Sequence, residues 1–557
     1  MRYPRRPSSR PVLLSSVALC AIAGGVWFQI ARRADAQLEG TLGGPRFVPS
    51  QNAPMPTAAP QLAIAAPQPS IATVARQTPL PAPPAIPDNQ RVRVGLSTEK
   101  GALAIWSANG LILRDLRQPA RALRSGPNEI VKFDLGAPVN ARSGALTFRG
   151  TISLDIAGRK STAWQYISVS VPGEQQARVT SNNKSARYGR PYRGGFEVFP
   201  QQLGEPDHRQ NELSLVNVVN MEDYLKGVVP WEMDPTAPLE ALKAQAMGAR
   251  TKTLDLRQSK RFAAGKFDIC DYDACQGYPG MENEKPLSSR AVDETRGLAI
   301  YSSGRVIDSV FSTNSGGISA NASDVWKTSS AISYLQSIRD FAPDSPLTQI
   351  VKPNMSEADW RLYCSQSWPS FARPSDADRA NLARRRATNA RVAALYGPDD
   401  EPEFYRWKRF ISVGDALSAF ADKGFAQVTK FEVAERAASG HIRQLRVEGI
   451  AKSTPGATIT PARQTAPLST TLVGDSAIRA MFSGRMGSTT ALPSSTFVIT
   501  PQAGADGKLQ GWQILGAGWG HGVGMCQRGA QNHALTGWDA RRIINWYYQG
   551  VEIRKLY

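Results

Sequence analysis

One segment constrains the fold most strongly, because a long helical pattern begins there at a residue that suits a helix start. Pro238 fits the first turn of a helix, where its missing N–H costs nothing. Apolar or small residues then repeat at helical spacing, at Leu239, Leu242, Ala246, Ala249 and Thr253. This pattern predicts one main helix over residues 238–257, with a buried stripe along one side.

A single acidic residue, Glu232, lies just before this helix in a bend that contains Trp231 and Met233. A carboxyl group in such surroundings is poorly solvated, which favours its protonated form and suits a general acid, while nearby cations oppose that effect. Lys243 and Arg250 fall almost in line on the helix, so both can point where Glu232 points. The alternative, in which Glu232 caps the helix or pairs with Arg250, stays open.

A glycine-rich loop near the C-terminus is a second candidate site, since five glycines surround His521 within nine positions. Glycine tolerates positive φ and has no Cβ, so the backbone of such a loop can approach a ligand closely. The spacing matches neither the dinucleotide-binding nor the phosphate-loop pattern, so we do not expect a phosphate cradle. We expect His521 to be a site residue, with a loop-stabilising hydrogen bond as the alternative.

Short alternating runs from Arg91 onward predict strands, separated by Gly, Asn and Pro, for example VRVGLS, LAIWS, YISVSV and LSLVNVVN. More strands are expected after the main helix, and a terminal helix near residues 538–548. The predicted fold class is therefore α+β, with a β-rich region over 91–557. Residues 355–408 form an expected basic, helical insertion, in which Leu382, Val392 and Leu395 stand among many charges.

The N-terminus carries the pattern of an export segment. Four arginines precede an apolar run over residues 11–31, which fits a signal peptide or an uncleaved membrane anchor. We assign residues 1–40 to this segment and residues 41–90, rich in Pro, Ala and Gln, to an extended linker. The remaining chain is then expected outside the cytoplasmic membrane, in the periplasm or cell wall, with the membrane contacted through the N-terminal segment.

The formal net charge of +19 raises the question of nucleic-acid binding. Aromatic residues are not interleaved with the basic runs, no nucleic-acid motif is present, and the chain carries an export pattern, so we expect no nucleic-acid partner. Attraction to an anionic cell wall or to lipid headgroups explains the same charge.

Four blocks resemble the SpoIID/LytB family, whose members include the stage II sporulation protein D. They are the YLKGVVP–EM–P block, the EALKAQA–AR helix, the ST-S-GG…S-D-W segment and the GHGVGM-Q-GA loop, at 224–235, 240–250, 312–326 and 520–530. The resemblance spans roughly residues 90–557. It implies a peptidoglycan lytic transglycosylase that cleaves the bond between N-acetylmuramic acid and N-acetylglucosamine, prefers peptide-stripped glycan and leaves a 1,6-anhydro end.

The resemblance also assigns roles to residues. It carries the family's acid onto Glu232, which acts alone as acid and then base because the C6 hydroxyl of the sugar is the nucleophile. Lys243 and Arg250 match the family's helix cations and are expected to hold the muramyl carboxylate or steady nearby oxygens. The substrate-binding residues expected beyond the helix are Ser312, Asn314, Ser315 and His521, although the first three fit a structural strand end equally well. The rival function is a glycan-binding protein without catalysis that modifies a cell-wall amidase.

The cysteines depart from the family pattern. Some relatives bind zinc through a C-D-T-T-H-C sequence, whereas this chain keeps Cys270 and Cys275 but has Ala274 in place of the histidine. We therefore expect a disulfide between these two cysteines, with zinc as the lesser alternative, and no cofactor. Cys526 near His521 invites a Cys/His nucleophile hypothesis, which lacks a third orienting group. Cys364 has no evident partner.

Overall fold

The computed structural model describes residue 87 and residues 90–96, 103–135, 151–174, 176–181, 189–203, 210–326, 331–452, 466–482 and 491–557. The predicted export segment and nearly all of the predicted linker lie outside these residues. Within the described ranges, no helix combines the length and apolar character that crossing a membrane requires.

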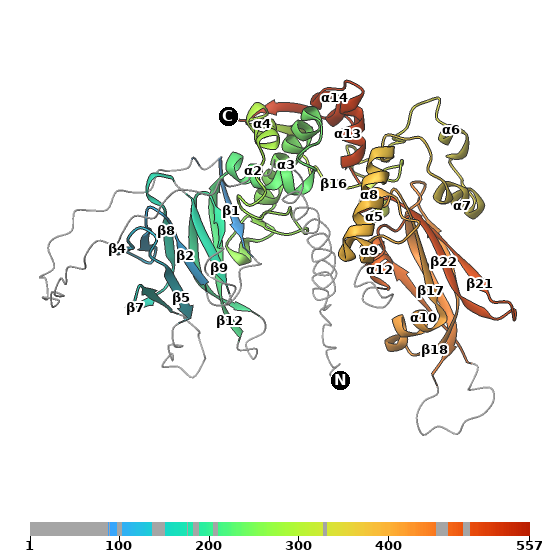
Figure 1. Cartoon of the computed structure of the whole chain (residues 1–557), viewed down its shortest axis with the longest axis horizontal. Coiled ribbons are helices and arrows are strands. Elements are labelled where there is room, and N and C mark those ends of the chain that lie inside the picture. The colour runs from blue at the N-terminus through green and yellow to red at the C-terminus, as the bar shows by residue number, and fades with distance from the viewer. Residues whose placement is uncertain are drawn as a thin grey trace, which may run out of the picture.

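The first part of the chain forms two antiparallel-rich sheets that face each other, coloured blue to cyan in Figure 1. Alternation explains them, because β6 buries Ile152, Leu154 and Ile156 and turns the residues between them outward. The seven-stranded sheet has the order β13 (Ile269–Cys270), β1 (Arg91–Gly95), β12 (Gln210–Asn220), β11 (Gly195–Leu203), β8 (Ile167–Ser170), β3 (Ile112–Asp115) and β4 (Gln118–Arg124). The six-stranded sheet has the order β10 (Arg190–Tyr192), β9 (Ala177–Ser181), β2 (Leu103–Trp106), β5 (Val131–Leu135), β6 (Ile152–Ile156) and β7 (Arg159–Trp164).

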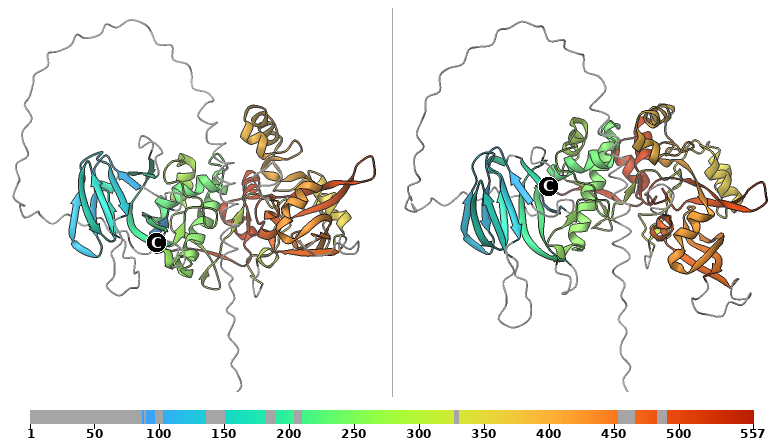
Figure 2. Two further views of the ribbon diagram at one scale, coloured as in Figure 1. Left: turned by 90° about the horizontal axis from the view of Figure 1, so that it is seen from below. Right: turned by 60° about the horizontal axis from the view of Figure 1, so that its bottom comes forward.

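A layer of helices follows directly from β12 and lies between the two strand-rich parts of the molecule (Figures 1 and 2). The predicted main helix is present as α3 (Leu239–Ser259), directly after Pro238. Its neighbours are α2 (Met221–Glu232), α4 (Pro286–Glu294), α13 (Gln527–Leu535) and α14 (Ala540–Tyr547). Residues from these helices share one hydrophobic core with the first two sheets, so α3 is fixed from several sides.

The helix α2 was not among the sequence-based predictions, which placed Glu232 in a bend. Gly227 and Pro230 disfavour a helix, and Pro230 lies inside α2. Burial overrides this local preference, since Tyr224, Leu225 and Val228 are fully buried. Asn220 caps the N-terminus by accepting a hydrogen bond from the Glu222 N–H at 2.9 Å.

The C-terminal part of the chain returns to this helical layer. The predicted terminal helix is α14, which buries Ile543, Ile544 and Tyr547. Small sheets complete the layer: β15 (Arg305–Val306), β14 (Leu298–Ser302) and β24 (Glu552–Lys555) form one, and β16 (Phe311–Ser312) with β23 (Met525–Cys526) forms another. The pairing of β16 with β23 is parallel and joins segments more than 200 residues apart in the sequence.

A second β region, formed by the described residues between Ala320 and Gly524, lies on the far side of the helical layer, coloured mainly orange in Figure 1. One three-stranded sheet of this region has the order β17 (Arg406–Ser412), β22 (Leu509–Ala517) and β21 (Phe497–Ala503). Another has the order β18 (Phe425–Arg436), β19 (Ile442–Ala451) and β20 (Pro467–Val473). Its helices are α5 (Ala322–Val325), α6 (Leu347–Ile350), α7 (Glu357–Ser365), α8 (Asp376–Thr388), α9 (Ala390–Leu395), α10 (Val413–Ala419) and α12 (Asp475–Ala480).

The expected helical insertion corresponds to α7, α8 and α9. In α8, Leu382 is the one buried residue and it contacts Val392 of α9. Of the arginines of this helix, Arg384 is exposed and the other three are half-buried. The described chain is thus a strand-rich α+β protein, as its alternating pattern predicts.

Candidate functional site

Glu232 is the last residue of α2, and its side chain is only 8% exposed. Its Oε1 accepts a hydrogen bond of 2.7 Å from the backbone N–H of Gly277. Met233 beside it is buried, and the indole of Trp231 lies so close to Gly277 that a Cβ there would come within 1.8 Å of Trp231 Nε1. Burial and the negative end of a helix both favour a protonated carboxyl group, whereas the Gly277 N–H favours the carboxylate.

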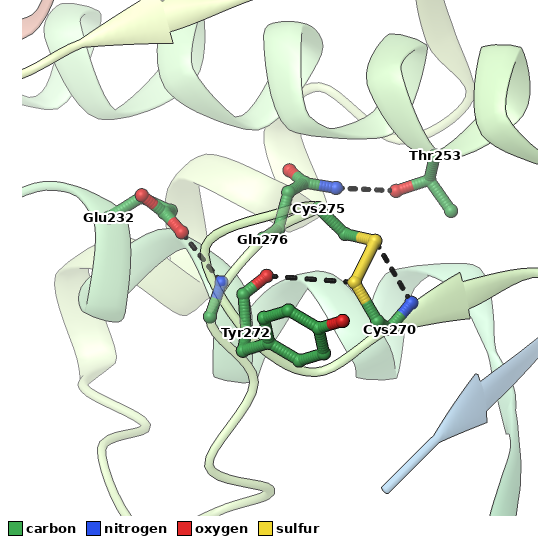
Figure 3. Close-up of a disulfide and its surroundings, with 7 residues drawn as sticks. Glu232, Thr253, Cys270, Tyr272, Cys275 and Gln276 are labelled. Carbon is green, nitrogen blue, oxygen red and sulfur yellow. Dashed lines mark hydrogen bonds between the residues drawn. A yellow bond between two sulfur atoms is a disulfide. The ribbon is translucent and has the colours of Figure 1, made fainter. Parts of the chain in front are cut away.

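The loop that carries Gly277 is closed by a disulfide between Cys270 and Cys275, shown in Figure 3. The expected pairing is therefore present. Gln276 follows directly, and its side chain reaches back to α3, where Nε2 donates to Thr253 Oγ1 at 2.9 Å and to the Ala249 carbonyl at 3.3 Å. Zinc would need the two sulfurs as thiolates, and with Ala274 between them the oxidised pair does not fit a zinc site.

Arg250 corrects one sequence-based expectation. Its side chain is fully buried and forms a two-pronged ion pair with Glu222 of α2, with bonds of 3.0 and 2.5 Å, and a further bond to the Leu298 carbonyl. The guanidinium therefore belongs to the interior between α2, α3 and β14, and it does not point toward Glu232. The helical spacing gave its position on α3 correctly but not its partner.

Lys243 also has other partners. Its Nζ lies 2.8 Å from Glu240 and 2.7 Å from Glu294, and these two carboxylates raise the pKa of the lysine. Glu240 in turn accepts a bond from the Ala540 N–H, at the start of α14. The lysine thus stays charged and ties α3 to α4 and α14, where we expected it to share the direction of Glu232.

The segment from Ser312 to Ser315 meets the glycine-rich loop, through the bridge between Asn314 and Trp519. Asn314 forms an isolated bridge with Trp519, and its side chain donates to the Ala372 carbonyl and accepts from the Gly316 N–H, both at 2.8 Å. Ser315 Oγ accepts from the Gly317 N–H at 3.3 Å. Asn314 and Ser315 therefore make the local hydrogen bonds that a structural role requires, and their binding of substrate stays a prediction. Ser312 differs, because its buried Oγ has no hydrogen-bond partner in the part of the chain that the structure describes.

His521 lies at the centre of the glycine-rich loop. Its Nδ1 accepts a 3.0 Å bond from the Val523 N–H, so the proton of the neutral ring is on Nε2. The ring lies 5.0 Å from that of Trp326, centroid to centroid. Burial lowers the pKa of His521 to about 4, and burial also lowers the pKa of His441, which lies beneath Gly522. His521 is therefore a neutral group at physiological pH.

These two lowered values predict a pH dependence of stability. The unfolded chain, with histidine pKa values near 6.5, binds more protons than the folded chain below about pH 6.5, and for His521 this difference extends down to about pH 4. The stabilisation is therefore complete above pH 6.5 and is lost as the pH falls. Each histidine contributes a slope of at most ~1.4 kcal/mol per pH unit. In urea titrations at pH 7 and pH 5, His521→Gln should lose less stability on acidification than the wild type. An equal loss in both proteins would contradict the prediction.

Cys526 is buried at the N-terminus of α13, where its sulfur accepts hydrogen bonds from the N–H groups of Ser315 and Gly529, both at 3.3 Å. Burial raises the pKa of this thiol to about 12. A nucleophilic cysteine needs the opposite shift, so the Cys/His hypothesis does not fit. Cys364 is also buried and free, with its pKa raised to about 11 by burial.

The burial of Cys526 predicts that iodoacetamide at pH 8 does not modify this residue in the folded protein. The treatment should therefore leave the activity of the protein unchanged. At that pH only about one thiol in ten thousand is ionised if its pKa is about 12. Peptide mapping by mass spectrometry would measure the labelling, with urea-unfolded protein as the control in which Cys364 and Cys526 both react. Labelling of Cys526 together with loss of activity would contradict the prediction.

The four blocks meet around the helical layer. Gln527 at the start of α13 donates to Gln245 of α3 at 3.3 Å. The carboxylates of Glu403, Asp378 and Asp234, in decreasing order of effect, raise the pKa of Arg528 against the opposing effect of burial, so Arg528 lies near Asp234. The residues just after Glu232 therefore lie close to α13. Sequence reasoning missed Gly277, because a backbone N–H has no side-chain signature. It also missed Gln276, because the partners of its side chain lie more than 20 residues earlier on α3.

Comparisons with known proteins show which parts of this sequence resemble known families. A family model described as stage II sporulation protein, SpoIID, matches residues 209–301, and a domain of unknown function (DUF8618) matches residues 320–524. The chain is 27% identical over 365 residues to an uncharacterized protein of Brachyspira hyodysenteriae, a match that covers 64% of this chain and 73% of the relative.

Two relatives from Bacillus subtilis carry functional names. The chain is 26% identical over 337 residues to an amidase enhancer, covering 59% of this chain and 40% of that protein. It is 32% identical over 180 residues to stage II sporulation protein D, covering 30% of this chain and 51% of that protein. The chain thus spans about half or less of the length of these two named relatives.

Proposed function

The chain belongs to the SpoIID family, and from that membership we propose that it is a lytic transglycosylase acting on peptidoglycan glycan strands. Family membership itself supports a function related to the cell wall. The observation that carries the finer proposal is Glu232, a carboxyl group 8% exposed at the end of α2, held through Oε1 by the Gly277 N–H.

In this proposal Glu232 is protonated when the glycan binds. It gives its proton to the oxygen that links N-acetylmuramic acid to N-acetylglucosamine, and the bond from that oxygen to C1 breaks. The C6 hydroxyl of the same muramyl residue then attacks C1, and the Glu232 carboxylate takes its proton, which yields a 1,6-anhydro end. One carboxyl group serves both steps, and the chemistry consists of proton transfer and ring closure.

In this proposal, Lys243 and Arg250 do not contact the substrate. Their charged ends bond to Glu222, Glu240 and Glu294 instead. The unpartnered Ser312 Oγ and the neutral His521 ring, both of the region where β16 meets the glycine-rich loop, are the proposed hydrogen-bonding groups for the glycan. We place the reaction outside the cytoplasmic membrane, on the strength of the apolar N-terminal run.

A second candidate function is a non-catalytic glycan-binding protein that modifies a cell-wall amidase. The relative named amidase enhancer favours it. In that case Glu232 would serve to hold the 270–277 loop in place, and glycan binding would not require its proton.

Product analysis separates the candidates. Peptide-free glycan strands are incubated with wild-type protein and with Glu232→Gln, and the products are identified by mass spectrometry. Anhydro-muramyl ends from the wild type alone would support the transglycosylase, and reducing ends would mean hydrolysis. Binding without products from either protein, together with stimulation of an added amidase, would favour the second candidate.

A further inference from the structure

Three attachments hold Gly277 against Glu232. The disulfide closes the loop between Cys270 and Cys275, the side chain of Gln276 binds α3, and the indole of Trp231 packs on the Gly277 backbone. Figure 3 shows the loop between the end of α2, with Glu232, and α3, with Thr253. The loop therefore links the carboxyl group to the main helix.

Gln276 is the attachment nearest to the hydrogen bond. The N–H that donates to Glu232 belongs to the peptide unit whose carbonyl is that of Gln276, so a fixed Gln276 also fixes the direction of this N–H. The side chain is 1% exposed, and its amide nitrogen donates to the Thr253 hydroxyl and to the Ala249 carbonyl. Thr253 donates in turn to the Ala249 carbonyl at 2.8 Å, so the amide is held by one turn of α3.

We infer that Gln276 is the positioning residue for the general acid: by binding the Ala249–Thr253 turn of α3, it aims the Gly277 N–H at Glu232 Oε1 and so sets the orientation and proton affinity of that carboxyl group. The inference rests on the proposed function, because it concerns the same carboxyl group. Gln276 itself contacts neither the glycan nor the reacting atoms in this scheme.

The charged and titratable groups around Glu232 come from three elements. Tyr224 of α2 is fully buried, and its pKa is raised well above the usual value by burial first and then by the nearby charges of Glu232 and Asp271. Asp271 of the loop is 3% exposed. From α13, Arg528 lies within electrostatic range of Asp234, two residues after Glu232. The Gly277 N–H is a neutral hydrogen-bond donor, and it favours the carboxylate form of Glu232, in opposition to Tyr224 and Asp271.

The test compares the pH dependence of glycan cleavage by the wild type and by the variant Gln276→Met. This substitution keeps the length of the side chain and removes its hydrogen-bond donors. A misdirected N–H no longer favours the carboxylate, so Glu232 stays protonated to higher pH. We expect the alkaline midpoint of kcat to move up by about one pH unit, kcat at pH 7 to fall about tenfold, and KM to change less than twofold. A merely structural role would lower the melting temperature without moving the pH midpoint.

Two further variants keep the test decisive. Thr253→Val removes one acceptor of Gln276 and should move the midpoint in the same direction by a smaller amount, so it serves if Gln276→Met does not fold. Gln444→Met is the matched control, because Gln444 Nε2 bonds to Glu435 at 2.6 Å on the distant β18–β19 sheet, and this variant should keep the wild-type pH profile.

The outcomes distinguish this inference from the function beneath it. An upward shift in Gln276→Met and Thr253→Val but not in Gln444→Met supports the inference. Cleavage by the wild type with the same pH midpoint in every variant overturns the inference and leaves the transglycosylase in place. The absence of any cleavage by the wild type overturns both.

Discussion

Replacement of Glu232 by Gln is expected to lower kcat for glycan cleavage by about 10²–10⁴, with little change in KM. Gln keeps the size of the side chain and can still accept a bond from the Gly277 N–H, but it has no proton of suitable acidity to give to the leaving oxygen. The same side chain must also act as the base in the second step, so both halves of the proposed reaction fail together. Initial rates on peptide-free glycan strands, followed by counting anhydro ends, would measure the effect.

A matched control for this variant is Glu197→Gln in the first pair of sheets. Glu197 is 9% exposed and bonds to Arg93 and Tyr166, so the substitution makes the same chemical change at a buried place outside the site. It should lower the stability of the protein and leave kcat unchanged. An undiminished rate in Glu232→Gln would remove this residue from the mechanism, whatever Glu197→Gln does.

Replacement of Arg250 by Met is expected to cost about 3–5 kcal/mol in the free energy of unfolding, because it leaves Glu222 as a buried charge without its cation. Glu222 is 2% exposed, and its carboxylate also accepts bonds from Gly297 and from the hydroxyl of Tyr557. These two neutral donors do not replace the lost charge. Urea unfolding followed by circular dichroism would measure the loss.

Two comparisons sharpen this prediction. Arg290→Met breaks an exposed ion pair with Glu294, in which the arginine side chain is 62% exposed, and it should leave the stability nearly unchanged. The double variant, with Glu222→Gln and Arg250→Met, should be less destabilised than the single variant Arg250→Met, because it contains no unpaired buried charge. A loss below about 1 kcal/mol in Arg250→Met would show that the pair is not an important interior contact.

The sequence predicted well what depends on periodicity. The stripe from Leu239 to Thr253 gave α3, and the alternating runs gave the strands of the first two sheets. The disulfide was expected because Ala274 replaces the histidine of the zinc-binding relatives. It predicted poorly what depends on distant partners. Helical spacing placed Arg250 on α3, but its partner Glu222 lies 28 residues earlier, on a helix that Pro230 and Gly227 concealed.

The candidate site shows the same division. Glu232 could be singled out from its neighbours in the sequence, since an acid among Trp231, Met233 and prolines is unusual. The group that holds it is the backbone of Gly277, 45 residues later, and backbone donors look alike in every sequence. The contacts of Asn314 with Trp519 and of Ser315 with Cys526 depend on the meeting of β16 with the glycine-rich loop and its flank, which the order of residues along the chain does not reveal.

The parallel pairing of β16 with β23 has a consequence for biosynthesis. Phe311 and Ser312 leave the ribosome more than 200 residues before Met525 and Cys526, and the whole second β region is made in between. Contacts of such long sequence separation form late and slowly. The region where β16 meets the glycine-rich loop, which the proposed function assigns to glycan contacts, is therefore completed only after the last part of the chain has been made.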